Sequence, residues 1–208
     1  MQRIFVTGIS TEVGKTVASA IIAEALQADY WKPVQAGELD NSDSHKVRDL
    51  ISNPRTVIHE STYALSMPIS PHAAAKIDDI TVDRQHIVEP VTNNHLVIEG
   101  AGGLLVPLNQ EDTILDIIMP NYQVVVVSRH YLGSINHSLL TIRWLQQKGY
   151  EVSVLFSGDE NAQTESIILH KTGVSMIGRI NEEPQFTKET ISKYANVFRP
   201  ALESLQTL

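Results

Sequence analysis

The segment from Gly8 to Thr16, GISTEVGKT, most narrowly limits what this chain can fold into. An apolar, β-branched run, Ile4 to Val6, comes directly before it, and apolar residues at helical spacing follow from Val17 to Leu26. We interpret this glycine-rich turn, which lies between a buried strand and a helix, as a full match to the phosphate-binding loop G-x-x-x-x-G-K-[ST]. We therefore predict that main-chain amides near Gly14 and the positive end of the following helix bind phosphate.

Apolar runs and helical patterns alternate along the rest of the chain. Several of the apolar runs contain almost no polar residues, as expected for strands that are covered on both faces of a sheet. The predicted strands are residues 3–6, 30–33, 96–99, 124–127, 152–156 and 175–177, and the predicted helices are residues 15–28, 44–52, 82–93, 135–148, 163–172 and 187–205. This order predicts an α/β fold: a doubly wound, mainly parallel sheet flanked by helices, P-loop NTPase-like, in one domain over residues 1–208.

Composition narrows the classes of partner. The formal net charge of −8 and the lack of clustered Lys and Arg argue against nucleic acid and anionic membranes. The absence of cysteine excludes disulfides and thiolate chemistry. No apolar stretch approaches the roughly 20 residues of a membrane span, and a predicted strand begins at Arg3, which leaves no room for a signal peptide. We therefore expect a cytoplasmic protein, with any anionic ligand held by a local arrangement of donors.

A lysine and an aspartate in the stretch YWKPVQAGELDNSD are candidates for the site. Lys32 comes at the carboxyl end of a predicted strand, so its side chain points toward the same rim as the phosphate loop and can hold an anion there. A solvated surface lysine is an equally good interpretation. Asp43 is a candidate metal ligand, or else the N-cap of the helix predicted from residue 44.

A carboxylate and a glycine-rich turn end the buried strand in LVIEGAGGLLVPL. Mg²⁺ prefers oxygen ligands, and one or two carboxylates with triphosphate oxygens complete its shell, so Glu99 suits that role. A carboxylate on a buried strand is costly without a metal or a cationic neighbour. Gly100, Gly102 and Gly103 permit close backbone approach to a ligand, although a plain packing turn is the alternative.

Five segments together resemble the dethiobiotin synthetase family. They occur in family order and at family-like spacing within residues 3–145, and they are GISTEVGKT, WKPVQAG, SPHAAA (residues 70–75), VIEGAGGLLVPL and LGSINHSLLTIRWL (residues 132–145). The resemblance implies an ATP- and Mg²⁺-dependent cyclo-ligase. In such an enzyme one amine of 7,8-diaminononanoate captures CO₂ as a carbamate, MgATP phosphorylates the carbamate, and the other amine closes the ring.

The resemblance also implies roles for individual residues. Lys15 and Lys32 are the catalytic residues, which hold the carbamate and the γ-phosphate, while Thr16, Asp43 and Glu99 ligate Mg²⁺. The implied nucleotide-binding residues are Thr11, Glu12, Val13, Gly14, Lys15, Thr16, Val17, Glu99, Gly102 and Ser157. The implied substrate-binding residues are Thr11, Lys32, Ala36, Gly102, Gly103, Leu132, Gly133 and Asn136. Family enzymes are homodimers, so residues 132–136 are expected to hold the substrate's carboxylate tail across the interface.

The chain departs from the family at two places. Ala36 stands where the family often has a hydroxyl residue. Ser157 and Gly158 stand near the position at which the family usually has an asparagine that contacts adenine, and Asn161 follows a few residues later. Two alternative functions share the fold: an amidoligase of the cobyrinate or CTP-synthase type, and a nucleotide-switch ATPase of the partitioning type. We interpret the scattered histidines as structural or surface residues, and Trp31 and Trp144 as core residues.

Overall fold

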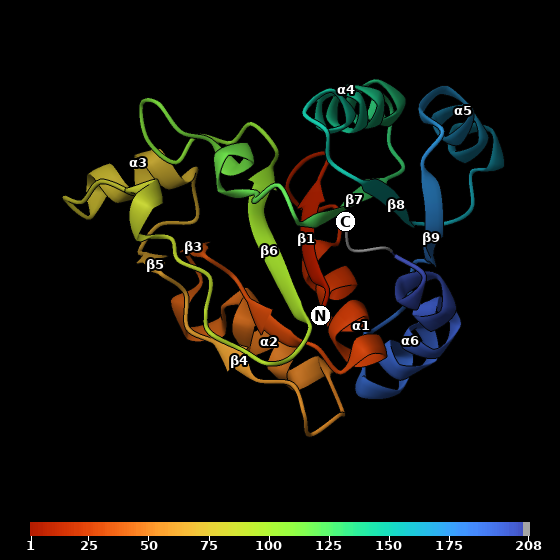
Figure 1. The fold of residues 1–208 in the computed structure, drawn as a ribbon, viewed down its shortest axis with the longest axis horizontal. Helices are drawn as coiled ribbons and strands as arrows, with labels where there is room; N and C mark the ends of the chain where they lie inside the picture. Colours follow the sequence, from red (N-terminus) through yellow and green to blue (C-terminus); the bar gives the residue numbers. More distant parts are fainter. Residues whose placement is uncertain (206–208) are drawn as a thin grey trace.

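The computed structural model describes residues 1–205 and contains a seven-stranded parallel sheet in the order β4-β2-β6-β1-β7-β8-β9 (Figure 1). The strands of this sheet are β1 (Arg3–Gly8), β2 (Asp29–Trp31), β4 (Ile58–His59), β6 (Leu96–Gly103), β7 (Gln123–Arg129), β8 (Val152–Ser157) and β9 (Ser175–Ile180). Two further strands, β3 (Val34–Ala36) and β5 (Tyr63–Leu65), form a separate parallel pair. The predicted doubly wound α/β fold is confirmed.

Helices cover both faces of the sheet (Figure 1). One layer contains α1 (Lys15–Leu26), α2 (Asp43–Leu50) and α6 (Lys188–Glu203), and the other contains α4 (Ser134–Gln147) and α5 (Ala162–Thr172). The short α3 (Pro71–Ile77) packs against β3 and β5, and the 3-10 helices are η1 (Leu39–Asn41), η2 (Arg84–His86) and η3 (Ile114–Ile117). Within residues 1–205 we find no helix with both the length and the apolar character that a bilayer crossing requires.

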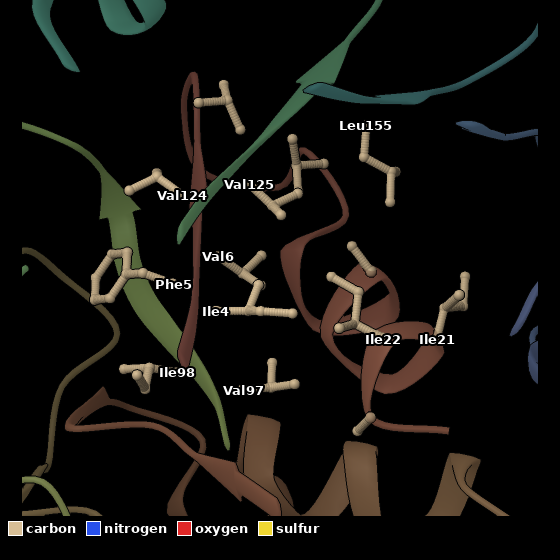
Figure 2. Close-up of a cluster of buried hydrophobic side chains, with 14 of the residues drawn as sticks. Ile4, Phe5, Val6, Ile21, Ile22, Val97, Ile98, Val124, Val125 and Leu155 are labelled. Carbon is tan, nitrogen blue, oxygen red and sulfur yellow. The ribbon is translucent and has the colours of Figure 1, made fainter. Parts of the chain in front are cut away.

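The central strand β1 is the middle of the hydrophobic core. Its apolar residues Ile4, Phe5 and Val6 are buried between the two layers of helices. Figure 2 shows these residues beside Val97 and Ile98 of β6, Val124 and Val125 of β7, and Ile21 and Ile22 of α1. Because β1 is paired on both edges and covered on both faces, the loop that follows it starts from a rigid base.

The predicted helix over residues 82–93 is wrong. The structure has only the 3-10 helix η2 there, followed by chain without regular secondary structure. Pro90 lies inside the predicted span, and proline removes a helix hydrogen bond and clashes with the preceding turn. The apolar residues that suggested a helical face do not share a buried side, because Val88 and Val91 are exposed. The segment is instead fixed by Glu89, which pairs with Arg3 and accepts a hydrogen bond from Tyr122.

Two other predictions need correction. The helix α3 was not predicted; it begins with Pro71, at a position where proline suits the first turn of a helix. The prediction that Trp144 is a core residue is also wrong, since 43% of its surface is exposed on α4. Trp31, in contrast, is buried as predicted.

Asp29 joins β2 to its neighbours at the amino end of the sheet. Its buried carboxylate accepts hydrogen bonds from the Thr92 hydroxyl (2.6 Å), the Val57 amide (3.0 Å) and the Asn94 amide group (3.1 Å). Burial by itself raises the pKa of Asp29, but these hydrogen bonds outweigh it and hold the pKa below its ordinary value. The carboxylate therefore stabilises the fold above its unfolded pKa, and that contribution is lost as the pH falls through the lower folded pKa.

Asp29→Ala is expected to reduce the free energy of unfolding by about 2–4 kcal/mol, because several buried donors lose their acceptor. Urea unfolding at pH 7 measures the change. Asp49→Ala is the matched control, since the Asp49 carboxylate is exposed and pairs only at the surface with Arg48; its effect is expected within about 0.5 kcal/mol. Equal effects of the two substitutions would contradict the role given to Asp29.

Candidate active site

The loop between β1 and α1 has the geometry of a phosphate-binding turn. Gly14, with φ of 93°, is the N-cap of α1, and Glu12 also adopts the left-handed conformation with φ of 53°. A side chain at Gly8 would lie 2.6 Å from Val13 Cγ2, so only glycine lets the loop close on itself. Five residues separate Gly8 from Gly14, one more than in the pattern G-x-x-x-x-G-K-[ST]. The loop is therefore a lengthened variant of this pattern, and the predicted full match is wrong by one residue.

A cleft of about 700 Å³ opens beside this loop, at the carboxyl ends of β1, β2 and β6. It brings together most of the residues that the sequence analysis selected. Those that line it are Thr11, Glu12, Gly14, Lys15, Thr16, Val17, Lys32, Ala36, Asp43, Glu99 and Gly102. They come from the phosphate loop, from the segments after β2 and β6, and from the first turns of α1 and α2. Residues far apart in the sequence thus share one hollow surface.

Lys32 lies between two carboxylates at the base of the cleft. Its ammonium nitrogen is 2.5 Å from Asp43 Oδ2 and 3.1 Å from Glu99 Oε1, and only 4% of the residue is exposed. Burial by itself lowers the pKa of Lys32, but Glu99 and Asp43 outweigh it and raise that pKa above its ordinary value. Lys32 is therefore charged in this site, and the interpretation of a solvated surface lysine is excluded.

Glu99 is a buried carboxylate with three donors. Thr16 Oγ1 donates to Oε1 at 3.0 Å, Lys32 donates to the same oxygen, and the Tyr30 hydroxyl donates to Oε2 at 2.9 Å. Glu99 is only 1% exposed, and such a group is stable only when hydrogen bonds or a cation compensate it. Both kinds of compensation are present here.

Lys15 is a second lysine that lines the cleft. Its ammonium donates to the Ser10 carbonyl oxygen at 3.1 Å, which folds the side chain over the phosphate loop. Burial lowers the pKa of Lys15 to about 8; Glu99 partly offsets this effect, and the nearby Lys32 adds to it. Two ammonium groups thus face the same hollow, which favours an anionic ligand between them.

Asp43 is the first residue of α2 and does not cap it. Ser42 is the N-cap, because its hydroxyl accepts from the His45 amide while the His45 ring accepts from the Ser42 amide. The alternative that Asp43 caps the helix is therefore excluded, and its carboxylate is turned toward Lys32 and Thr16. Burial raises the pKa of Asp43, but Lys32 outweighs it, so that the pKa lies below its ordinary value.

The oxygen atoms of the cleft fit a magnesium ion. Thr16, Asp43 and Glu99 present one hydroxyl and two carboxylates to the same space, all hard oxygen donors. Within residues 1–205 no group of three or more His, Cys, Asp or Glu is arranged to hold a metal ion. A set of two carboxylates and one hydroxyl suits a cation that retains water and shares its shell with phosphate oxygens.

The remaining selected residues lie outside the cleft lining. Val13 is buried beneath the loop, and Ser157 packs against Gly14 from β8. Gly103 lines a neighbouring groove. Leu132, Gly133 and Asn136 lie where α4 begins, with Leu132 and Asn136 exposed. Residues 132–136 therefore do not line the cleft of their own chain.

Sequence reasoning missed several residues of the site. Tyr30 contacts Glu99, and Gln35 accepts a hydrogen bond from the Asp43 amide at 3.2 Å. Lys46 and Arg129 line the cleft from α2 and β7. A signal for Tyr30 was present, since alternate residues of a strand share a face and Tyr30 is two residues before Lys32. No comparable signal existed for Arg129, which follows an almost wholly apolar run.

An apolar groove of about 530 Å³ adjoins the cleft. Thr11 and Val106 line both hollows, so the two are neighbours. The groove is also lined by three large apolar side chains that are exposed: Leu105 in the turn after β6, and Leu140 and Trp144 on α4. A contiguous set of exposed apolar side chains beside a polar cleft is typical of an interaction surface.

The family model described as "AAA domain" matches residues 2–190. Among solved structures, the chain resembles the MinC:MinD cell division protein complex of Aquifex aeolicus, with a TM-score of 0.63, 16% identity and coverage of 100% of this chain and 98% of that chain. It also resembles a plasmid partition protein of Borrelia burgdorferi bound to AMPPNP, with a TM-score of 0.63, 13% identity and coverage of 98% and 99%. At such low identity these likenesses show the fold alone.

Curated relatives are much more similar in sequence. The ATP-dependent dethiobiotin synthetase BioD of Christiangramia forsetii is 54% identical over 95% of this chain and 96% of its own length. The protein of the same name from Cytophaga hutchinsonii is 46% identical over 94% of this chain and 96% of its own length. Identity at this level over nearly the whole of both chains extends well beyond the phosphate loop. The chain belongs to the ATP-dependent dethiobiotin synthetase family.

Proposed function

We propose that this chain is an ATP-dependent dethiobiotin synthetase that carboxylates 7,8-diaminononanoate with CO₂ and closes the ureido ring. The observation that carries the proposal is one cleft in which two lysines and two carboxylates lie beside a phosphate-binding loop. The similarity to relatives named for this activity supports it. In this cleft the protein contributes positioning and charge, which phosphoryl transfer requires, and needs no enzyme nucleophile.

In the proposed reaction one substrate amine adds to CO₂ and loses a proton, giving a carbamate. A carbamate oxygen accepts the γ-phosphoryl group of ATP, and ADP is released. The second amine then attacks the carbamate carbon, loses a proton, and expels phosphate. Lys32 and Lys15 would hold the carbamate and the γ-phosphate and stabilise the charge that develops on the transferring group.

We propose that Thr16, Asp43 and Glu99 hold Mg²⁺ in the nucleotide complex. The ion would neutralise charge on the triphosphate oxygens. The phosphate loop would bind those oxygens through its amides, with Gly14 and the start of α1 adding the positive end of the helix dipole. Gly102 lines the cleft, has a left-handed φ of 67° and carries no side chain, so it would contact the substrate through its backbone. The residues that contact the base, Ser157 among them, stay a prediction, as does the cytoplasmic location.

The experiment that tests the function supplies the purified protein with diaminononanoate, bicarbonate, Mg²⁺ and ATP, and detects dethiobiotin by mass. We expect dethiobiotin and ADP in equal amounts, both dependent on the diamine. ATP hydrolysis at the same rate with and without the diamine would contradict the ligase function. Such a result would instead favour the nucleotide-switch alternative, which at present has fold likeness alone in its support.

We also propose that two copies of the chain associate through the apolar groove and α4. The nine-carbon substrate has an amine-bearing end and a carboxylate end, so it needs an apolar path out of the cleft. The groove that begins at Thr11 and Val106 offers such a path. Residues 132–136 of a second copy would contact the substrate's carboxylate there, which agrees with their exposure on their own chain.

Trp144→Arg is expected to convert the dimer to a monomer, because it places a charge in an apolar contact that a large aromatic residue would dominate. Dethiobiotin formation should fall about tenfold or more through a raised KM for the diamine. Sedimentation and steady-state kinetics measure the two effects. Val197→Arg is the matched control, since Val197 is also apolar and exposed but lies on α6. A Trp144→Arg protein that stays dimeric would exclude this interface.

A further inference from the structure

Tyr30 is fully buried in β2 and does not line the cleft, yet its hydroxyl contacts the cleft's central carboxylate. The hydroxyl donates to Glu99 Oε2 at 2.9 Å. The ring thus lies behind the site, on the side of Glu99 that a ligand in the cleft does not reach. None of the roles implied by family resemblance involves this residue.

The pairing of β2 with β6 places the hydroxyl there. Tyr30 is paired with Val97 and Trp31 with Ile98 in this parallel ladder. Lys32 and Glu99 come directly after the last paired residues, Trp31 and Ile98, and their side chains meet at 3.1 Å. Because paired residues of a parallel ladder and alternate residues of a strand share one face, Tyr30, Val97 and Glu99 lie on the same face of the sheet. A tyrosine two residues before the site lysine therefore has the reach to place its hydroxyl behind the Glu99 carboxylate.

The three donors to Glu99 are divided unequally between its oxygens. Thr16 and Lys32 both donate to Oε1, whereas Tyr30 donates to Oε2. With Oε2 held from behind, the carboxylate plane cannot rotate without breaking a buried hydrogen bond, so Oε1 stays directed at Thr16 and Lys32. A carboxylate oxygen can only accept, so in this contact the Tyr30 hydroxyl is the donor.

We propose that Tyr30 is a positioning residue for the metal-nucleotide site: its hydroxyl fixes the Glu99 carboxylate so that one oxygen faces the cleft as a ligand. The inference rests on the proposed role of Glu99 as a metal ligand. It predicts that removal of this single hydroxyl weakens binding of the divalent cation while the cleft, its lysines and its diamine path remain.

The test uses Tyr30→Phe in the full chain, with Mn²⁺ as the probe and AMPPNP as the nucleotide. A titration with Mn²⁺, monitored by electron paramagnetic resonance, is expected to give a Kd for Mn²⁺ about tenfold higher than that of the original protein. A change of this size is typical when a hydrogen-bond partner of a metal ligand is removed. In steady-state assays the metal concentration for half-maximal rate should rise by a similar factor, whereas the KM for the diamine should stay within about twofold. If the hydroxyl had only a structural role, its loss would not change the metal requirement while leaving the KM for the diamine unchanged.

Tyr122→Phe is the matched control. Tyr122 is also a buried tyrosine, and its hydroxyl also donates to a glutamate, Glu89 Oε2 at 2.7 Å, at the amino end of β7. The Kd of the Tyr122→Phe protein for Mn²⁺ should equal that of the original protein. An unchanged Kd in Tyr30→Phe, or an equal rise in both variants, would overturn the proposal. If the original protein forms no dethiobiotin but Tyr30→Phe still weakens Mn²⁺ binding, the proposed reaction fails and the positioning role stands.

Discussion

Lys32→Met is expected to lower dethiobiotin formation by at least about a thousandfold, because it removes a fixed positive charge from the place where negative charge develops. Methionine keeps most of the length and the apolar stem of lysine, so the cleft retains its shape. In the structure the ammonium is buried and held by Asp43 and Glu99, which means that its position is set before any ligand binds. Mass detection of dethiobiotin under single-turnover conditions measures the loss.

The same substitution has a second expected effect, on stability. Without the ammonium, Asp43 and Glu99 remain as two neighbouring carboxylates, and breaking a buried ion pair in this way typically costs about 3–5 kcal/mol. Added Mg²⁺ should restore part of the lost free energy of unfolding, since a cation that binds only the folded state stabilises it. Urea unfolding with and without Mg²⁺ separates the two contributions.

Lys171→Met is the control for both effects. Lys171 is exposed near the end of α5, in the helix layer opposite α1 and α2. Its replacement should leave the rate unchanged and alter stability by less than about 0.5 kcal/mol. Turnover of the diamine by Lys32→Met at a rate near that of Lys171→Met would show that the buried ammonium is not part of the reaction.

The sequence predicted the central part of the fold because its signals are local. The phosphate loop, the apolar strands and the amphipathic helices each have a period or a motif within a short window. The predicted helix over residues 82–93 is wrong because helical spacing of apolar residues does not guarantee a buried face, and Pro90 prevents a continuous helix. The short strands β3 and β5 escaped prediction, since three residues are too few to show a period.

The site could be predicted in part only, because its decisive contacts are not local. Lys32 and Glu99 are 67 residues apart in the chain, and only the register of β2 against β6 makes them neighbours. A lysine at a strand end is compatible with solvent or with a buried pair, and the sequence does not distinguish the two. Asp43 was ambiguous for a different reason: both Ser42 and Asp43 are residue types that cap helices, and the observed backbone selects Ser42.

Glu99→Gln is expected to raise the Kd for Mn²⁺ in the AMPPNP complex by about a hundredfold and to lower the rate by at least as much. Glutamine has the shape of glutamate but lacks its charge. Its amide nitrogen is also a hydrogen-bond donor, whereas both positions at the end of this side chain must accept. Thr16 and Lys32 donate to one oxygen and Tyr30 donates to the other. The amide nitrogen of glutamine must therefore face a donor in either orientation. Since an ammonium cannot accept a hydrogen bond, the nitrogen is expected to face Tyr30, whose hydroxyl hydrogen must then turn away within a fully buried space.

Glu24→Gln separates this effect from the loss of a buried carboxylate in general. Glu24 is buried on α1 and accepts hydrogen bonds from the Ser52 amide at 2.8 Å and the Asn53 amide at 3.1 Å, away from the residues that line the cleft. Its replacement is expected to reduce the free energy of unfolding by about 1–3 kcal/mol while leaving the Kd for Mn²⁺ unchanged. A Glu99→Gln protein that loses stability as Glu24→Gln does, yet binds Mn²⁺ with its original affinity, would mean that Glu99 supports the strand end and does not ligate the metal.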